Sequence, residues 1–416
     1  AAYGAEFFLY EKMGRRAIDH DGSTSETGSN KSVQTCYSQK RRESKGTRPR
    51  CVVSRRTAEP RGQRPRGLPT RERMIAMIDY ILTALRRLIA IDSPTGYTAQ
   101  ASGFLMEELA SMGYSPQRTR KGGVLCGLGG EGEGLCLLAH ADTLGGMVAA
   151  VKDSGRLRIT PLGGLSPQNT EGENCRVYTR DGRAYSGTLQ LENPSVHVNR
   201  EYNTKERSFD TMEVVLDEDV STKEAAKALG IRGGDIVCFD PRFTLTDSGY
   251  IKSRFLDDKL SAAILLGLAK WISQEHPALS RRLCLHFTVF EEIGHGACAS
   301  LPDWVTELIS VDMGCVGQGL ECTERMVSIC VKDSQGPSNY DLTTRLIQLA
   351  EEQKLSYALD VYPFYGSDGD AALRAGYDLR HGLIGPGVYA SHGYERSHKD
   401  GVENTFRLLK ACVTAL

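Results

Sequence analysis

The chain has 416 residues, of which 40% are hydrophobic and 25% are charged, and its formal net charge is −1. This length allows two domains, or one large domain with an insertion, and the composition is ordinary for a globular protein. No apolar run of about 18 or more residues occurs, so no helix is expected to span a membrane.

Residues 1–73 form a basic segment without sustained periodicity. They hold 17 Lys and Arg against 8 Asp and Glu, whereas the remainder holds 34 against 44. Such a segment cannot bury enough apolar area to offset its ordering entropy. We predict a disordered tail, or translated sequence upstream of the true start, since the first patterned helix begins near Met74 or Met77. A nucleic-acid-binding arm is the alternative that we do not favour.

The next segment, residues 74–150, opens with two predicted amphipathic helices over 77–91 and 101–113, the second ending at a glycine. Residues 123–142 then contain two short apolar strands around a glycine-rich turn. We interpret this segment as the first part of a catalytic α/β domain.

Residues 151–246 have a different pattern, with short alternating strands separated by turns. Asp181 and Gly182 lie between two of these strands, which is a hairpin signal. We predict a small β-rich domain inserted into the α/β domain.

The second part of the catalytic domain, residues 247–416, repeats one theme: an apolar strand that stops at a polar residue, with helices between. Apolar strands that alternate with helices predict an α/β fold, here a mixed sheet covered by helices on both faces. The strands are expected within 282–292, 304–314, 325–334 and 379–393, and the helices within 257–272 and 339–353.

The twelve cysteines contain no C-x-x-C pair. Several of them, such as Cys136, Cys284 and Cys330, lie inside apolar runs, where a free thiol behaves as a small hydrophobic group. We therefore expect a reduced, cytoplasmic setting rather than a disulfide framework.

Most of the polar residues that could carry chemistry follow the predicted strands, at the ends where an α/β sheet binds its ligands, and Asp257 and Asp258 open the predicted helix over 257–272. Imidazole and carboxylate groups together are ligands for zinc, cobalt or manganese. Taken singly, each has a simpler explanation, such as a helix N-cap for Asp257 or Asp258 or a core histidine for His140. Their conjunction favours a metal site that suits two ions about 3.5–4 Å apart, as in metal-assisted hydrolysis. The residues are His140, Asp142, Asp257, Asp258, Glu291, Glu292, Asp312 and His392.

Five motifs in this order resemble the metal-site motifs of the tetrahedral (TET) aminopeptidases, a family of glutamyl-aminopeptidase-like dinuclear metallopeptidases. The resemblance covers about residues 77–415 and extends to the inserted domain through "ITPLGG" and "ALGIRGGDIVCFD". The motifs are "AHADTLGGMV", "LDDKLSAAILL", "FEEIGHGA", "SVDMG" and "SHGYERSHKDGVENTFRLL".

The resemblance implies two divalent metal ions per subunit, with zinc expected and cobalt or manganese as alternatives. Asp257 would bridge the two ions, Glu291 would be the catalytic acid and base, and Asp142 would orient His140. The metal ligands that it implies are His140, Asp257, Glu292, Asp312 and His392.

The function expected from the resemblance is an aminopeptidase that removes N-terminal residues from short peptides, using a metal-bridged hydroxide and a glutamate general base. Self-association into a large homo-oligomer, commonly a dodecamer in the family, is implied as well. Departures from the family pattern at Thr143, Gly146 and "YGSDGDAA" motivate an alternative, a same-fold hydrolase of an N-acyl or dipeptide-like metabolite. A catalytically dead metal-binding scaffold is a further alternative, against which the retained Glu291 and ligand set argue.

Overall fold

The computed structural model describes residues 70–415, so nearly all of the predicted basic tail lies outside the described residues. The first helix, α1 (Thr70–Ile89), begins within the segment assigned to the tail, and residues 70–73 form its first turn. That turn reads TRER and contains no apolar residue, which explains why the hydrophobic pattern starts later. None of the helices in the described part combines the length and apolar character needed to cross a bilayer.

Six further α-helices and a short 3-10 helix follow α1 in the described residues. They are α2 (Ala99–Ser111), α3 (Lys223–Ala228), α4 (Leu256–Glu275), η1 (Glu291–Ile293), α5 (Tyr340–Glu352), α6 (Asp368–Arg374) and α7 (Lys399–Ala415).

Twelve strands form one mixed sheet in the described residues, in the order β1-β2-β12-β3-β13-β17-β18-β11-β10, with β14 and β15 also pairing with β17, and β16 pairing with β15. They are β1 (Gln117–Arg118), β2 (Val124–Gly129), β3 (Gly134–His140), β10 (Thr244–Leu245), β11 (Tyr250–Ser253), β12 (Arg282–Thr288), β13 (Val305–Val311), β14 (Gly314–Val316), β15 (Val327–Lys332), β16 (Tyr357–Val361), β17 (Arg380–Tyr389) and β18 (Glu395–His398).

Four neighbouring strands at the centre of this sheet, β12, β3, β13 and β17, run parallel to one another. All seven residues of β3 are buried, which is the pattern of a strand covered on both faces. The predicted α/β class with a mixed sheet is therefore confirmed. The parallel pairing also brings the carboxyl ends of these four strands to one edge of the sheet.

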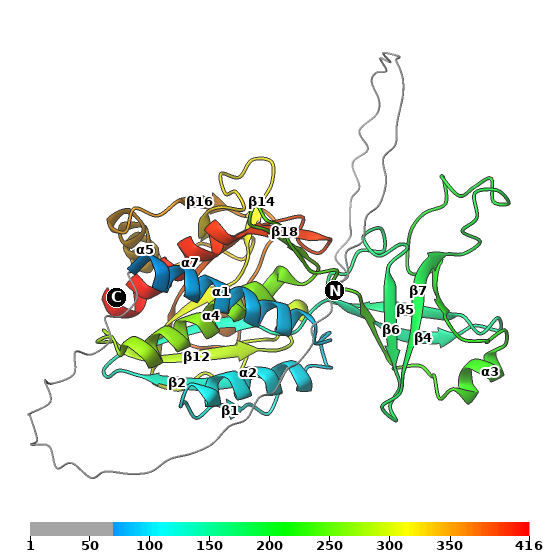
Figure 1. Cartoon of the computed structure of the whole chain (residues 1–416), viewed down its shortest axis with the longest axis horizontal. Coiled ribbons are helices and arrows are strands. Elements are labelled where there is room, and N and C mark those ends of the chain that lie inside the picture. The colour runs from blue at the N-terminus through cyan, green and yellow to red at the C-terminus, as the bar shows by residue number, and fades with distance from the viewer. Residues whose placement is uncertain (1–69, 416) are drawn as a thin grey trace, which may run out of the picture. The chain divides into compact units, whose positions relative to one another are not determined.

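Helices cover the two faces of the sheet unequally. Leu135, Leu137 and Ala139 of β3 belong to the main core, to which α1, α2, α4, α5 and α7 contribute, and Figure 1 shows α1 lying along α4. The alternate residues Cys136 and Leu138 join a smaller cluster with residues 297–308 and α6. One face is thus packed by long helices, and the other by a loop and one short helix.

The segment predicted as an insertion forms a closed antiparallel barrel in the order β4-β5-β8-β7-β6-β9. The barrel spans residues 145–239, whereas the predicted segment is 151–246. Its first strand, β4, begins shortly after β3 ends, and β10 pairs with β11 in the large sheet instead of joining the barrel. The predicted hairpin joins β6 to β7, and Gly182 in its turn has a φ of 88°. The barrel strands are β4 (Gly145–Val151), β5 (Leu157–Leu162), β6 (Asn174–Tyr178), β7 (Ala184–Leu191), β8 (Met212–Leu216) and β9 (Ile236–Phe239).

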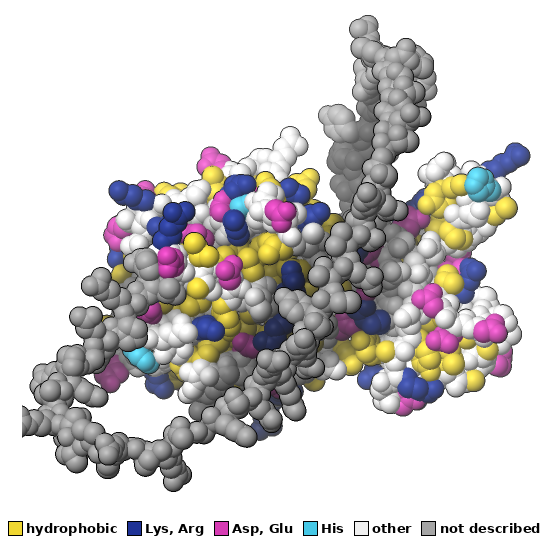
Figure 2. Space-filling model, viewed as in Figure 1, with side chains coloured by type: hydrophobic (Ala, Val, Ile, Leu, Met, Phe, Trp, Pro, Cys, Tyr) yellow, Lys and Arg dark blue, Asp and Glu magenta, His cyan; other side chains and the backbone are white. Residues whose placement is uncertain are grey.

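Charged side chains of both signs are interspersed over the described residues on the face drawn in Figure 2. A surface that binds nucleic acid typically gathers Lys and Arg into one patch or stripe. This face therefore offers no support for nucleic-acid binding by the described part of the chain.

Candidate metal centre

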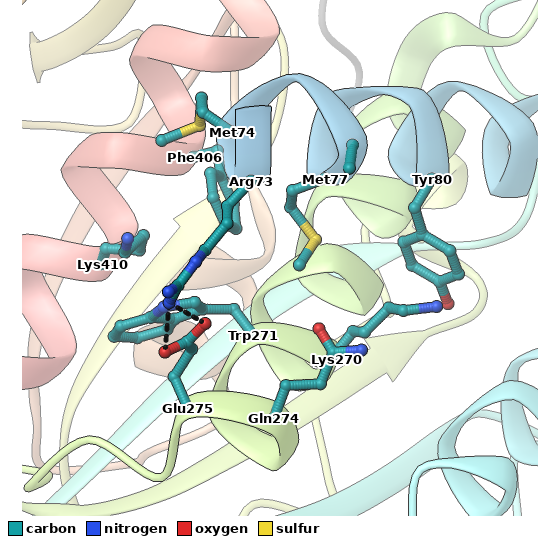
Figure 3. Close-up of a pocket in the computed structure, with 11 residues that line it drawn as sticks. Arg73, Met74, Met77, Tyr80, Lys270, Trp271, Gln274, Glu275, Phe406 and Lys410 are labelled. Carbon is teal, nitrogen blue, oxygen red and sulfur yellow. Dashed lines mark hydrogen bonds and ion pairs between the residues drawn. The ribbon is translucent and has the colours of Figure 1, made fainter. Parts of the chain in front are cut away.

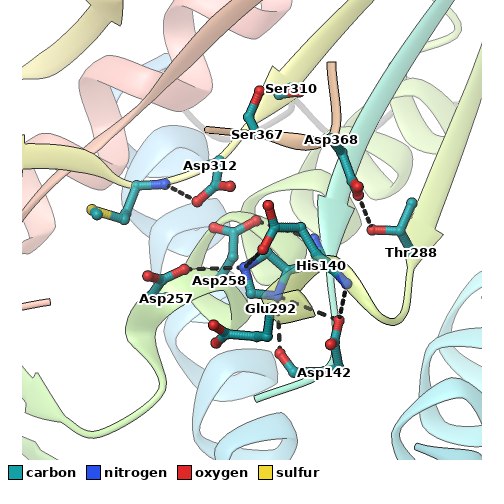
Figure 4. Close-up of polar contacts among 12 residues, drawn as sticks. His140, Asp142, Asp257, Asp258, Thr288, Glu292, Ser310, Asp312, Ser367 and Asp368 are labelled. Carbon is teal, nitrogen blue, oxygen red and sulfur yellow. Dashed lines mark hydrogen bonds and ion pairs between the residues drawn. The ribbon is translucent and has the colours of Figure 1, made fainter. Parts of the chain in front are cut away.

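The predicted site residues converge at the edge where the four parallel strands end. His140 is the last residue of β3, Asp312 follows β13, and His392 follows β17 by three residues. Glu291 and Glu292 open η1, three residues after β12 ends. The beginning of α4 reaches the same place and brings Asp257, as the close-up shows (Figure 4).

Asp257 lies between the two histidines. Its Oδ1 atom is 3.0 Å from Nε2 of His140, and its Oδ2 atom is 3.6 Å from Nε2 of His392. The two oxygens of one carboxylate thus face two imidazoles that come from different strands. This is the arrangement expected of a carboxylate that bridges two cations.

Both imidazoles are oriented by backbone carbonyl groups. Nδ1 of His140 lies 2.9 Å from the carbonyl oxygen of Asp142, and Nδ1 of His392 lies 3.2 Å from that of Gly164. A carbonyl oxygen can only accept, so each Nδ1 donates a proton to it. Each Nε2 faces the Asp257 carboxylate, where a bound cation would take its lone pair. A hydrogen bond of this kind typically fixes the tautomer of a metal-binding histidine.

Gly164 belongs to the segment after β5 and lies directly against His392. A Cβ atom at this position would be 2.7 Å from Nδ1 of the ring. A glycine is therefore required for the carbonyl group to approach the imidazole this closely. The inserted segment takes part in building the site, which the sequence pattern alone did not indicate.

The carboxylates of η1 and β13 complete the cluster. Glu291 Oε2 lies 3.7 Å from Nε2 of His140, and Glu292 Oε2 lies 3.8 Å from Nε2 of His392. Within the described residues, two groups have ligand atoms that all lie within 4.8 Å of one another. They are His140, Asp257 and Glu292, and His140, Asp258 and Asp312.

Asp142 is fully buried, and its carboxylate acts on Glu291 rather than on the ring of His140. Its Oδ1 atom accepts a hydrogen bond from the backbone amide of Glu291 at 3.2 Å, and its Oδ2 atom accepts one from the hydroxyl of Thr95 at 2.6 Å. Oδ1 is 3.7 Å from Nδ1 of His140. The orienting contact to the imidazole therefore comes from the carbonyl group of Asp142, while its side chain holds the turn that presents Glu291.

Asp258 belongs to the cluster, although the sequence allowed it to be a helix cap. Asp257 and Asp258 have non-helical backbone angles at the beginning of α4, and among the described residues the Asp258 carboxylate accepts no backbone amide of that helix. Oδ2 of Asp258 instead accepts the backbone amide of His140 at 3.2 Å. Its Oδ1 atom is buried and has no hydrogen-bond partner within residues 70–415, which suits a position beside a cation.

The acidic groups are crowded in a buried place, and this raises most of their pKa values. Burial, followed by neighbouring charges, raises the pKa of Glu291, Glu292 and Asp258 well above the usual range and that of Asp312 to about 7. For Asp257, burial acts in the same direction, but the two histidines outweigh it and its pKa is lowered. So many carboxylates can all be ionised only if cations offset their repulsion, and the donor set therefore fits divalent metal ions.

Strained backbone occurs in three of the segments that carry site residues. Phe255, Phe290, Ala390 and His392 have positive φ values of 67°, 72°, 59° and 62°. Such left-handed conformations cost on the order of 1–3 kcal/mol each in a non-glycine residue, and they persist where the surroundings over-determine them. Their clustering beside the site is the pattern expected of a preorganised functional centre.

A pocket of about 460 Å³ opens onto the cluster. Besides the acidic residues and His392, it is lined by residues of the loops after β13, β15 and β16, including Phe364 and Tyr365, and by Arg374 at the end of α6. A larger cavity of about 580 Å³ lies elsewhere, between α1, α4 and α7, and Figure 3 shows its lining of aromatic, methionine and charged side chains. None of the predicted site residues lines that larger cavity, so the smaller pocket is the candidate substrate site.

Two functional candidates were missed from the sequence. Glu395 lies three residues after His392, is 2% exposed and accepts hydrogen bonds from two site segments. Asp368 accepts one hydrogen bond from the hydroxyl of Thr288 at 2.5 Å and one from the backbone amide of Ala297 at 2.7 Å. Asp368 thereby ties both sides of the turn that carries Glu291. The available signals were the motifs "SHGYERSHKDGVENTFRLL", which contains Glu395, and "YGSDGDAA", which contains Asp368.

The fold and the site together have the features of a metal-dependent hydrolase, with most of its candidate ligands at the carboxyl ends of parallel strands. The family model described as M42 glutamyl aminopeptidase matches residues 122–408. The chain is 43% identical over 329 residues to "Putative aminopeptidase YhfE" of Bacillus subtilis, covering 78% of this chain and 94% of that protein. The chain therefore belongs to the M42 glutamyl aminopeptidase family, and it is a metal-dependent peptidase, as the motifs predicted.

Solved structures support the same fold. A TET1 peptidase of Pyrococcus horikoshii, described as able to assemble into a tetrahedron or a large octahedral shell, superposes with a TM-score of 0.72 at 21% identity. The match covers 81% of this chain and all of that one. The structure of PhTET1-12s, a dodecamer, gives a TM-score of 0.70 at 20% identity, over 80% of this chain and 99% of that one.

Proposed function

We propose that this peptidase is a dinuclear aminopeptidase whose two metal sites share Asp257. His140 and Asp312 belong to one site, His392 and Glu292 to the other, and Asp258 lies close enough to contribute to the first. The observation that carries the proposal is the position of the Asp257 carboxylate, with one oxygen toward the Nε2 atom of each histidine. Nitrogen and oxygen donors of this kind suit zinc, with cobalt and manganese as alternatives.

Two divalent cations held by these residues would polarise the scissile carbonyl group and lower the pKa of an attacking water molecule. Glu291 is the residue that takes a proton from this water and passes it to the leaving amine. Its backbone amide is held by the buried carboxylate of Asp142, so its side chain is presented in a defined direction.

The proposed substrates are short peptides with a free N-terminal amine. The acidic groups that line the pocket are the proposed ligands Asp257, Glu292 and Asp312 and the proposed base Glu291. Cations held by these residues could accept the lone pair of a free amine, which a neutral amide does not offer. An N-acetyl cap removes the charge and the lone pair of the amine. The capped substrate therefore loses its contact at the end of the pocket where the chemistry takes place.

We expect aminoacyl reporter substrates to be cleaved, and their N-acetylated counterparts to be cleaved at least about 100-fold more slowly. The capped substrate leaves buried polar groups of the site without a partner, and such a loss lowers kcat/KM by at least this factor. The measurement is a substrate panel with metal-stripped enzyme resupplied with zinc, cobalt or manganese in turn. Preferential cleavage of the N-acetylated series would instead indicate the metabolite hydrolase that the departures near the site suggested.

We further propose that the barrel, residues 145–239, mediates self-association. Val196 and Val198, in its loop between β7 and β8, are 58% and 74% exposed. Exposed apolar side chains on a protruding loop are candidates for burial at an interface. The large assemblies of the TET structures are consistent with this proposal.

Light scattering on the purified protein is expected to give a mass several times that of one chain. Val196→Asp together with Val198→Asp is expected to lower this mass, because charges at an apolar interface are costly to bury. The matched control is Val361→Asp, which places a charge at an exposed valine of β16, outside the barrel. A monomeric wild-type protein at micromolar concentration would contradict the proposed self-association. It would leave the proposed peptidase mechanism unaffected.

A further inference from the structure

Glu395 is a buried carboxylate outside the proposed ligand set. It is the first residue of β18 and is 2% exposed. β18 pairs with β11 in an antiparallel register that places Glu395 opposite Ser253, just before the chain turns into α4. This pairing places the carboxylate next to the first residues of α4, among them Asp257.

The two oxygens of Glu395 bond to two different site segments. Oε2 accepts a hydrogen bond from the backbone amide of Asp257 at 3.1 Å, and Oε1 accepts one from the backbone amide of His392 at 3.1 Å. Asp257 and His392 are far apart in the sequence and belong to different elements. One side chain therefore joins the proposed bridging ligand to a proposed terminal ligand.

Both segments need such a support, because their backbones are strained. Phe255, two residues before Asp257, is left-handed, and so are Ala390 and His392 itself. Strained conformations persist only where surrounding contacts hold them. Hydrogen bonds from backbone amides to a buried carboxylate are among the stronger contacts available, since one partner can carry a charge.

We propose that Glu395 is a positioning residue that sets the separation between Asp257 and His392. It thereby sets the fit of the metal ion that His392 and Glu292 would hold. This inference rests on the proposed dinuclear function and deepens it. It assigns to Glu395 no contact with substrate and no proton transfer. Its consequence is a specific loss of metal affinity when the carboxylate is changed.

The test is Glu395→Gln, compared with the wild-type protein by competition for zinc against a chromogenic chelator. The amide keeps one acceptor oxygen but turns an NH₂ group toward one of the two backbone amides, so one contact is lost. We expect the weaker of the two zinc sites to lose affinity by about 10–100-fold, the range typical of partners behind metal ligands. In the metal-free state the unfolding temperature should fall modestly, because one buried hydrogen bond is lost. The rise in unfolding temperature produced by zinc should shrink in addition.

Glu213→Gln is the matched control. Glu213 is a carboxylate of similar burial in β8, where it pairs with Lys152 and Arg156 away from the site. If the glutamine variant at 395 does not fold, Glu395→Asp permits the same comparison, because it keeps the charge and shortens the reach.

Wild-type zinc affinity at both sites in the Glu395 variant would overturn the inference, and so would an equal loss in Glu213→Gln. If the wild-type protein itself binds fewer than two zinc ions, the proposed dinuclear function fails, and the inference with it. The wild-type titration thus separates the two failures.

Discussion

Glu291→Gln is expected to lower kcat by about 10²–10⁴-fold, the usual contribution of a positioned acid and base. The amide has nearly the same shape as the carboxylate but cannot take up a proton. Because Asp142 holds Glu291 through the backbone amide, the turn should keep its conformation in the variant. The metal content should therefore remain that of the wild type.

Steady-state kinetics on a free-amine reporter, together with elemental analysis, checks this expectation. Glu307→Gln is the matched control, because Glu307 is a buried carboxylate near the start of β13, at the opposite end of the sheet from Asp312. It pairs with Arg281 and Arg380, so the control should cost stability but leave kcat near the wild-type value. A Glu291→Gln enzyme with near-normal turnover would remove Glu291 from the mechanism.

Asp257→Asn is expected to abolish stable binding of at least one metal ion and to lower activity by about 10³-fold or more, since metal stabilisation of the reacting group is worth several kcal/mol. The amide offers one oxygen in place of two and carries no charge. In the wild type, Oδ1 faces Nε2 of His140 and Oδ2 faces Nε2 of His392. The amide can place an oxygen toward only one of these two atoms.

Metal content after exhaustive dialysis, and partial rescue of activity by excess zinc, are the measurements for Asp257→Asn. The matched control is Asp235→Asn, a fully buried aspartate beside β9 whose Oδ2 atom accepts the amide of Arg232. The control should retain the wild-type metal content. Retention of two ions by the Asp257 variant would contradict its role as the shared ligand.

The ends of the parallel strands were predictable from the sequence because an apolar run followed by a polar residue is a local pattern. The sequence alone was enough to predict that four of the site residues lie close together, since parallel strands end at one edge of the sheet. They are His140, Glu291, Asp312 and His392. The position of Asp257 could not be obtained in this way, because α4 begins after β11, which lies away from the centre of the sheet. There the motif resemblance supplied what the pattern could not.

Features that depend on long-range register were not predictable. The role of Glu395 follows from its position opposite Ser253, which no local signal encodes. The contact of Gly164 with His392 joins the segment after β5 to the segment after β17. The start of the barrel was missed for a local reason: the run "GGMVAAV" follows the β3 loop without a turn signal between them.

Titration of zinc into the metal-stripped wild-type enzyme, with cleavage of a free-amine reporter as the readout, shows whether this family member uses two metal ions that share Asp257. We expect no activity in the stripped enzyme and a plateau at about two equivalents of metal per chain, as a two-metal hydrolase requires. Full activity at one equivalent, or activity that persists in the presence of a strong chelator, would contradict the use of two metal ions.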